Sequence, residues 1–250
     1  QIGANIELSQ FDDSNILIDG YLDETVWEKA VKINRFNNYL PVDGGLAEDD
    51  ADIMIWYSKE AIYFGIRANA DPGEVRSTLA DRDKLSNDDY VMIILDTYND
   101  QRTAYAFGVN PLGQQTDGTI TDNVPDRKAA MPFSIDKNPD YVFDSKGRII
   151  DTGYIIEVKI PFKSLRYSSN EIQNWGFNVL RSVQHSRHLL SLTEAKLGEA
   201  SFLAQNSQLV NIKNINTKRL FYINPELRND LNRSLLHLES ILRRLTFFVR

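Results

Sequence analysis

The chain has 250 residues, 42% of them hydrophobic and 25% charged, and its formal net charge is −7. This composition suits one large all-β domain or two small domains. The acidic excess argues against nucleic-acid binding, which relies on clustered lysine and arginine, and the lack of cysteine excludes disulfides and thiolate metal sites. No apolar run reaches the ~20 residues of a membrane-spanning helix. The polar start at Gln1 predicts either a mature exported protein or an internal boundary of a longer chain.

One short helix is predicted near the amino terminus, and strands follow it. Asp23 is a suitable N-cap for a helix that runs through Ala30 and presses Trp27 against a sheet. Residues 51–57 and 61–68 alternate with a period of two, which is typical of strands half-buried against a core. Because only a short turn separates these two segments, they are predicted to form a hairpin.

A second hairpin and a further strand are predicted downstream. Residues 89–98 and 102–110 should pair and turn at Asn99 and Asp100, because Asn and Asp tolerate a left-handed backbone. Residues 154–161 should form a strand that ends at its proline, which has no backbone N–H to donate. The side chains predicted to face the core are Ile53, Ile55, Phe64, Ile66, Ile156, Val158 and Ile160.

The last third of the chain changes in character. Residues 121–146 contain three prolines and no sustained period, so they are predicted to form a long surface excursion. Residues 175–183 alternate again and predict a strand. From Asn229 onward, leucines at helical spacing with interspersed arginines predict an amphipathic helix that docks on its own domain, a neighbouring chain or a membrane surface. The predicted organisation is therefore a β-sandwich over residues 1–220 and a helical segment over residues 221–250.

Five motifs, in this order and at this spacing, carry a family resemblance. They are DGYLDETVWEKA at Asp19–Ala30, RD at Arg82–Asp83, NDDYVMIILDTYND at Asn87–Asp100, FGVNPLG at Phe107–Gly113 and YIIEVKIPFKSLRY at Tyr154–Tyr167. Over roughly residues 16–209 the chain resembles family 9 carbohydrate-binding modules. It resembles more closely the amino-terminal domain of Bacteroidetes proteins in which such a module precedes an outer-membrane β-barrel.

The resemblance implies both a fold and a function. The fold would be all-β, a sandwich of two antiparallel sheets with jelly-roll or immunoglobulin-like connections. Such a module binds sugars, often holds calcium, and does no chemistry of its own. The implied partner is an oligo- or polysaccharide. The implied location is the periplasm, the outer membrane or the cell exterior, with outer-membrane association through a partner or a barrel domain.

Sugars stack on aromatic rings and bond to planar polar groups. The candidates for such contacts are Trp56, Arg82, Tyr90, Trp175 and Arg181. Each has a structural alternative: the two tryptophans could pack in the core, and the tyrosine could be half-exposed or packed. The Arg82 side chain could form a solvated loop ion pair with no function. The Arg181 side chain either points to water or crosses the concave face of its sheet.

Calcium needs six to eight converging oxygen ligands. Asp83, Asp88 and Asp89 are dense enough to contribute, but no EF-hand spacing is present. A solvated acidic loop is the alternative interpretation of the same residues.

Three functions from different classes remain open. The leading hypothesis is a non-catalytic carbohydrate-binding module of an exported protein. The second is a scaffold or interaction domain of an outer-membrane protein without sugar affinity, and the third is an accessory domain of a glycoside hydrolase. No catalytic residue is predicted, because no HExxH, serine-elbow or phosphate-loop motif is present. Haem binding would need an axial His or Met in a deep pocket.

Overall fold

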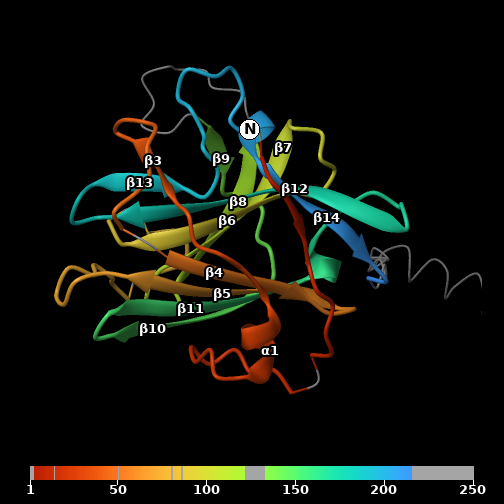
Figure 1. Ribbon diagram of the computed structural model, residues 1–250, viewed down its shortest axis with the longest axis horizontal. Helices are drawn as coiled ribbons and strands as arrows, with labels where there is room; N and C mark the ends of the chain where they lie inside the picture. The colour runs from red at the N-terminus through yellow and green to blue at the C-terminus, as the bar shows by residue number, and fades with distance from the viewer. Residues whose placement is uncertain are drawn as a thin grey trace, which may run out of the picture. The chain divides into compact units, whose positions relative to one another are not determined.

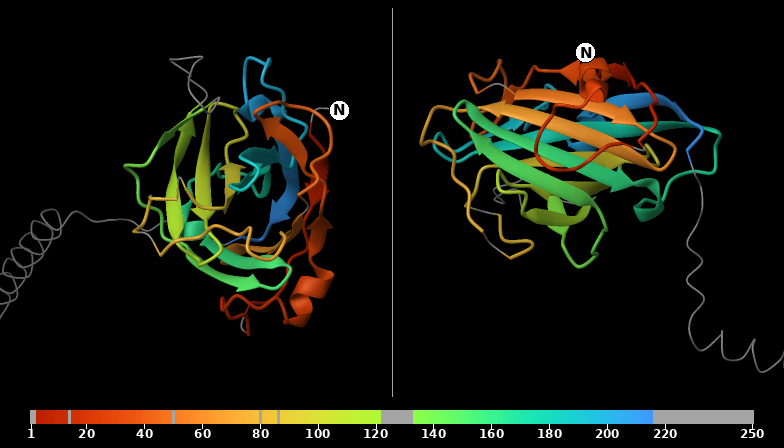
Figure 2. Two further views of the ribbon diagram at one scale, coloured as in Figure 1. Left: turned by 90° about the vertical axis from the view of Figure 1, so that its left-hand side faces the viewer. Right: turned by 90° about the horizontal axis from the view of Figure 1, so that it is seen from below.

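The computed structural model describes residues 3–13, 15–49, 51–79, 81–85, 87–121 and 133–215. Its strands form two sheets that face each other across a hydrophobic core (Figure 1, Figure 2). The predicted β-sandwich is therefore confirmed, whereas the predicted helical segment 221–250 lies outside the described residues. Within the described part of the chain, no helix combines the length and apolarity that a membrane span requires.

The larger sheet, here called sheet A, has the order β1–β14–β12–β6–β7–β8–β9. Its strands are β1 (Asn5–Glu7), β14 (Ser207–Lys213), β12 (Ile172–Val183), β6 (Tyr90–Asp96), β7 (Thr103–Val109), β8 (Gln115–Thr121) and β9 (Ser134–Asp136). Beside this path, β13 (His188–Ser191) pairs with β12 and with β3 (Asn37–Leu40). All of these pairs are antiparallel except β1 with β14, which run parallel.

The smaller sheet, sheet B, has the order β10–β11–β5–β4–β2. Its strands are β10 (Asp144–Ile150), β11 (Gly153–Pro161), β5 (Ala61–Asn69), β4 (Ala51–Tyr57) and β2 (Val31–Ile33). The helix α1 (Thr25–Lys29) lies against the outer face of this sheet (Figure 1). Two short 3-10 helices, η1 (Phe162–Ser164) and η2 (Leu203–Gln205), connect strands.

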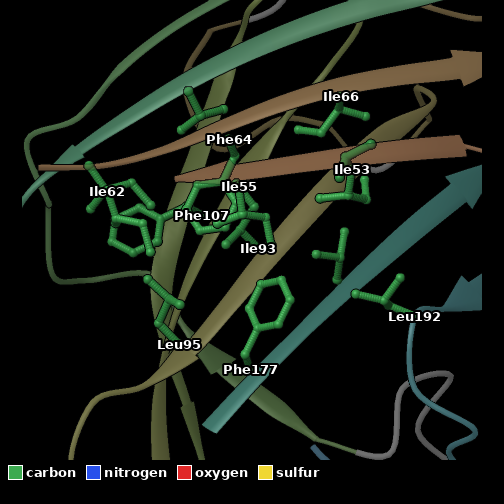
Figure 3. Close-up of a cluster of buried hydrophobic side chains, with 14 of the residues drawn as sticks. Ile53, Ile55, Ile62, Phe64, Ile66, Ile93, Leu95, Phe107, Phe177 and Leu192 are labelled. Atoms are coloured by element: carbon green, nitrogen blue, oxygen red, sulfur yellow. The ribbon is translucent and has the colours of Figure 1, made fainter. Parts of the chain in front are cut away.

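The core between the sheets is built by period-two alternation. All seven predicted core side chains belong to one buried cluster and have no exposed surface. Phe64 from sheet B and Phe177 from sheet A meet across the interface, with ring centroids 6.0 Å apart (Figure 3). Burial of each such side chain contributes roughly 1.5–3 kcal/mol, so the predicted alternation identifies the main source of stability.

The outer faces of both sheets are also largely covered. On sheet B, the rings of Trp27, Trp56 and Tyr63 form a second cluster under the amino-terminal segment. A Cβ atom at Gly65 would lie 2.9 Å from the Trp27 ring, so glycine is needed there for close packing of α1. On sheet A, Tyr39, Phe133 and Phe202 pack over the middle strands in a third cluster.

Several local details differ from the predictions. The helix α1 begins at Thr25 with Glu24 as its N-cap, not Asp23, and no side chain caps it. In the β6–β7 turn, Asn99 and Gln101 adopt positive φ values of 53° and 60°. The described part of the predicted surface excursion contains β9 and the start of β10. The two predicted hairpins, β4–β5 and β6–β7, are confirmed.

Candidate functional site

Both predicted stacking tryptophans outside α1 are buried in the structure. The Trp56 ring stacks on Tyr63 with a centroid separation of 4.0 Å and has no exposed surface. Trp175 is likewise fully buried and meets the edge of Phe162 at 5.9 Å in the core between the sheets. Neither ring therefore presents an open face to a sugar. Trp56 is buried because α1 covers the outer face of sheet B. Trp175 is buried because it lies on the same core-facing side of β12 as Phe177.

Arg181 is buried rather than placed on a concave face. It is paired with Val91 and Leu190 in the sheet register, and both of those residues face the core. Its Nη2 donates to the backbone oxygen of Asn69 at 2.6 Å, and its guanidinium lies 5.7 Å from the centre of the Tyr154 ring. Asn69 and Tyr154 belong to sheet B, so Arg181 links the two sheets across the interior.

Tyr90 is the one predicted ring with partial exposure. It lies at the start of β6 and packs against the cluster on the outer face of sheet A. Burial raises the pKa of its hydroxyl, and a hydrogen bond with Ser182 opposes that shift. Tyr39, Phe133 and Phe202 belong to the same cluster and cover part of this face.

The three acidic candidates for calcium each accept hydrogen bonds from different partners. Both Asp89 oxygens accept backbone N–H groups, from Arg76 at 3.0 Å and from Gln184 at 2.6 Å. The Asp88 carboxylate accepts from Thr78 and from Asn110 Nδ2.

The third carboxylate, Asp83, accepts from the Thr116 hydroxyl and the Asp117 amide. In the described ranges, no three Asp, Glu or His side chains gather into a possible metal site. These carboxylates hold the connection between β5 and β6 against sheet A.

Arg82 lies in that same connection. Of the two arginines predicted to contact a sugar, it is the one with an accessible guanidinium. Its Nε donates to Asp117 Oδ1 at 2.9 Å and its Nη1 to Gln115 Oε1 at 3.0 Å. Its Nη2 donates to the Tyr141 carbonyl at 2.9 Å, and its guanidinium lies 5.7 Å from the centre of the Phe143 ring. The Arg82 side chain is 38% exposed, whereas that of Asp117 is 1% exposed.

Two of these Arg82 partners line an open groove of about 430 Å³. The groove, here called the edge groove, lies where β8 of sheet A approaches the β10 edge of sheet B. It is lined by Ile16, Leu17, Ile18, Gln115, Phe143, Asp144, Ser145 and Lys159. Its size suits a small ligand.

The edge groove combines polar and apolar surface. The Gln115 amide is fixed by two donated bonds, to Ser145 Oγ at 2.9 Å and to the Phe143 carbonyl at 3.0 Å. Asp144 and Lys159 are direct neighbours in the β10–β11 register, and they supply one negative and one positive group. Leu17, which is 67% exposed, supplies apolar contact surface, whereas Phe143 is only 5% exposed and belongs to the core between the sheets. Such a mixture suits a neutral ligand with many hydroxyl groups.

Sequence reasoning identified Arg82 but none of the eight lining residues. The lining comes from four separate stretches, residues 16–18, 115, 143–145 and 159. Lys159 lies in the motif at Tyr154–Tyr167, but the pattern there predicts a strand and does not mark this lysine as a ligand contact. The register of β10 with β11 was needed to bring Asp144 and Lys159 together.

The fold is similar to that of solved carbohydrate-binding modules. A search of curated proteins found no match. A family 9 carbohydrate-binding module of Caldicellulosiruptor kristjanssonii in complex with cellotriose is 16% identical, with a TM-score of 0.56, covering 88% of this chain and 100% of that chain. The structure of such a module from the same organism with glucose is 17% identical, with a TM-score of 0.54 and the same coverage.

A candidate carbohydrate-binding protein of Bacteroides uniformis ATCC 8492 is 12% identical, with a TM-score of 0.60, covering 83% of this chain and 99% of that chain. At these identities the three structures establish the shared fold. A family model described as carbohydrate family 9 binding domain-like matches residues 18–185. Because this match spans more than half of the sequence, the chain belongs to the carbohydrate family 9 binding domain-like family.

Proposed function

We propose that this protein is a non-catalytic carbohydrate-binding module and that its saccharide ligand occupies the edge groove. The observation that carries the proposal is the family match over residues 18–185. The groove adds a place for the ligand, because it is open, mixed in polarity and bordered by fixed hydrogen-bonding groups. The two modules from Caldicellulosiruptor kristjanssonii have the same fold and were solved with cellotriose and glucose.

Each group in the groove has a defined part in this proposal. Gln115, Asp144, Ser145 and Lys159 would exchange hydrogen bonds with hydroxyl groups, and the exposed Leu17 would contact the apolar face of a sugar ring. Arg82 would hold the Gln115 side chain in place through the hydrogen bond that it donates to Gln115 Oε1. Because the groove is open, affinity should be weak, about 10 µM to 1 mM, which corresponds to roughly −7 to −4 kcal/mol.

Titration calorimetry with cellotriose and glucose tests the proposal. Lys159→Met and Asp144→Asn should each weaken binding by roughly three- to tenfold, since each removes a charge-assisted hydrogen bond. Lys163→Met, which changes an exposed lysine on η1, should leave affinity unchanged. Failure of the wild-type protein to bind any saccharide in a broad glycan screen at millimolar concentration would refute the function.

The same titration distinguishes the groove from the outer face of sheet A. Tyr90→Ala removes the half-buried ring on that face. If Tyr90→Ala abolishes binding while the Lys159 and Asp144 variants bind normally, the saccharide lies on sheet A and the edge groove assignment is wrong. Melting curves must accompany each variant, because Tyr90 also packs against a buried cluster.

A scaffold or interaction module without sugar affinity is the second candidate. The observation that favours it is the packing of Tyr39, Phe133 and Phe202 over sheet A, which occupies a face that could otherwise hold a ligand. A module with no detectable ligand in the glycan screen would take this role. In either role we propose an exported protein that associates with the outer membrane through a partner or a barrel domain, and cell fractionation tests this location.

Calcium stays a prediction from the resemblance. An ion bound to the native state would raise the melting temperature by mass action. Melting curves in excess chelator and in millimolar calcium therefore test for bound calcium. Identical curves would show that the protein binds no calcium that stabilises it. The existing hydrogen bonds to Asp83, Asp88 and Asp89 explain how the loop could hold its shape in either case.

A further inference from the structure

The apolar wall of the edge groove, Ile16–Ile18, lies between two carboxylates that hold its ends. On one side, Asp13 Oδ2 accepts hydrogen bonds from the Tyr63 hydroxyl at 2.7 Å and from the Ser58 hydroxyl at 2.8 Å. On the other side, Glu157 Oε2 accepts the backbone N–H groups of Asp19 at 2.9 Å and Gly20 at 2.7 Å. The amino-terminal segment thus crosses the outer face of sheet B (Figure 2). The four hydrogen bonds attach it to that sheet on both sides of the wall.

Glu157 is an unusual residue for the middle of a sheet. It lies in β11 opposite Gly65 of β5, on the face away from the core, and it has no exposed surface. Its Oε1 is buried without a hydrogen-bond partner, so the two backbone N–H groups provide the main compensation for burying the charge. Burial raises the pKa of Glu157 to about 7, and those two N–H groups act in the opposite direction.

Charged groups of the amino-terminal segment and of β10 lie around Glu157. Asp19 and Glu24 of the amino-terminal segment add to the rise of its pKa by repulsion. Lys146 of β10 is its direct neighbour in register, and Arg148 of β10 donates from Nε to the Gly20 carbonyl at 3.1 Å. The segment that carries the groove wall is therefore held by one buried carboxylate and one arginine at this end.

We infer that Glu157 is a positioning residue for the edge groove, which fixes the wall Ile16–Ile18 without contacting the ligand and thereby sets saccharide affinity. This inference rests on the proposed function. The physical reason is that an ionised Glu157 is poorly compensated, because its Oε1 is buried without a hydrogen-bond partner and only Oε2 accepts the two N–H groups. When the carboxyl ionises, the segment that buries it is held less firmly, and the ligand must then order the wall as it binds, which lowers affinity.

Glu157→Gln tests this inference because it keeps the size of the side chain and one acceptor oxygen but removes the charge. Amide hydrogen exchange at Asp19 and Gly20, corrected for intrinsic rates, should be roughly tenfold slower in Glu157→Gln at pH 8, where the wild-type carboxyl is ionised. The dissociation constant for cellotriose should fall by a similar factor. In the wild-type protein, both quantities should approach those of the variant as pH falls from 8 to 6.

Glu171→Gln, which alters an exposed glutamate before β12, is the matched control and should match wild type in exchange and affinity at every pH. Equal protection of Asp19 and Gly20 in wild type and Glu157→Gln, with cellotriose affinity independent of pH, would overturn the inference. If Glu157→Gln does not fold, the pH dependence of wild-type exchange and affinity gives the same decision. If the wild-type protein binds no saccharide in the broad glycan screen, the proposed function fails, and unchanged exchange separately rejects Glu157 as the attachment point.

Discussion

At the scale of single residues, Arg181 places a charge between two hydrophobic sheets. The bond from its Nη2 to Asn69 and the proximity of its guanidinium to the Tyr154 ring provide partners from the opposite sheet. Arg181 also lowers the pKa of Asp89 by attraction, against the rise caused by burial. The arginine is therefore part of the sandwich rather than part of a ligand surface.

Replacing Arg181 with methionine should destabilise the protein. The substitution keeps the length of the side chain but leaves the Asn69 carbonyl without this donor and Asp89 without this positive neighbour. We expect the free energy of unfolding to fall by about 2–4 kcal/mol in urea titrations. Arg102→Met, at an exposed turn position, should change it little. Cellotriose affinity that falls while stability stays constant would instead place Arg181 at the ligand.

Glu157 should give stability a measurable pH dependence. Its pKa rises from the ordinary value of 4.5 to about 7 in the folded protein, so the folded state keeps a proton that the unfolded chain releases. The stabilising effect is fully present below pH 4.5 and is lost as pH rises through about 7. Relative to Glu157→Gln, wild type should lose up to about 3 kcal/mol over this range. Parallel curves of stability against pH for the two proteins would contradict this expectation.

The sequence predicted some residue positions well, for a physical reason. Ile53, Phe64 and Val158 were placed correctly because alternation reports which side chains share a face. Alternation does not report whether the other face is covered. The sequence therefore could not decide whether Trp56 is buried or available to a sugar. Arg181 shares the inward parity of Phe177 and Val179 in β12, so the signal for its burial was present in the pattern.

At the scale of elements, the hairpins were predictable because they are local, whereas pairings between distant segments were not. β13 and β3 are short and join residues far apart in sequence. The pairing of β1 with β14 likewise joins opposite ends of the described chain. Short strands offer too few residues for a period to stand out, so their pairing depends on the completed sandwich.

Val158→Asp tests the facing of the central strand β11. Val158 is fully buried and lies opposite Phe64 in register. An aspartate there would be an uncompensated charge in the core. The free-energy cost of burying it exceeds the free energy of unfolding of an ordinary domain. We expect loss of cooperative unfolding by circular dichroism. Val142→Asp, at a valine that is 69% exposed, is the control and should melt normally.

At the scale of the whole molecule, the edge groove depends on both sheets and on the amino-terminal segment. Its lining joins Gln115 of sheet A, Asp144, Ser145 and Lys159 of sheet B, and the wall Ile16–Ile18. Sequence patterns indicate the elements, but a groove formed where an edge strand meets another sheet exists only after those elements assemble. This explains why the family and fold were predictable while the groove was not.

The parallel pairing of β1 with β14 joins the two ends of the described part of the chain. Removing this pairing tests whether the stability of the fold and the affinity of the edge groove depend on different residues. Deleting residues 1–9 removes β1 and the buried Leu8 but leaves the wall and both of its attachment points in place. Loss of the buried leucine and of the strand pairing should cost about 2–3 kcal/mol, or roughly 4–12 °C in melting temperature. Leu8→Ala in the full chain should reproduce part of this loss. Cellotriose affinity should stay at the wild-type value at temperatures where the deleted protein is folded, and a loss of affinity there would show that the groove depends on β1.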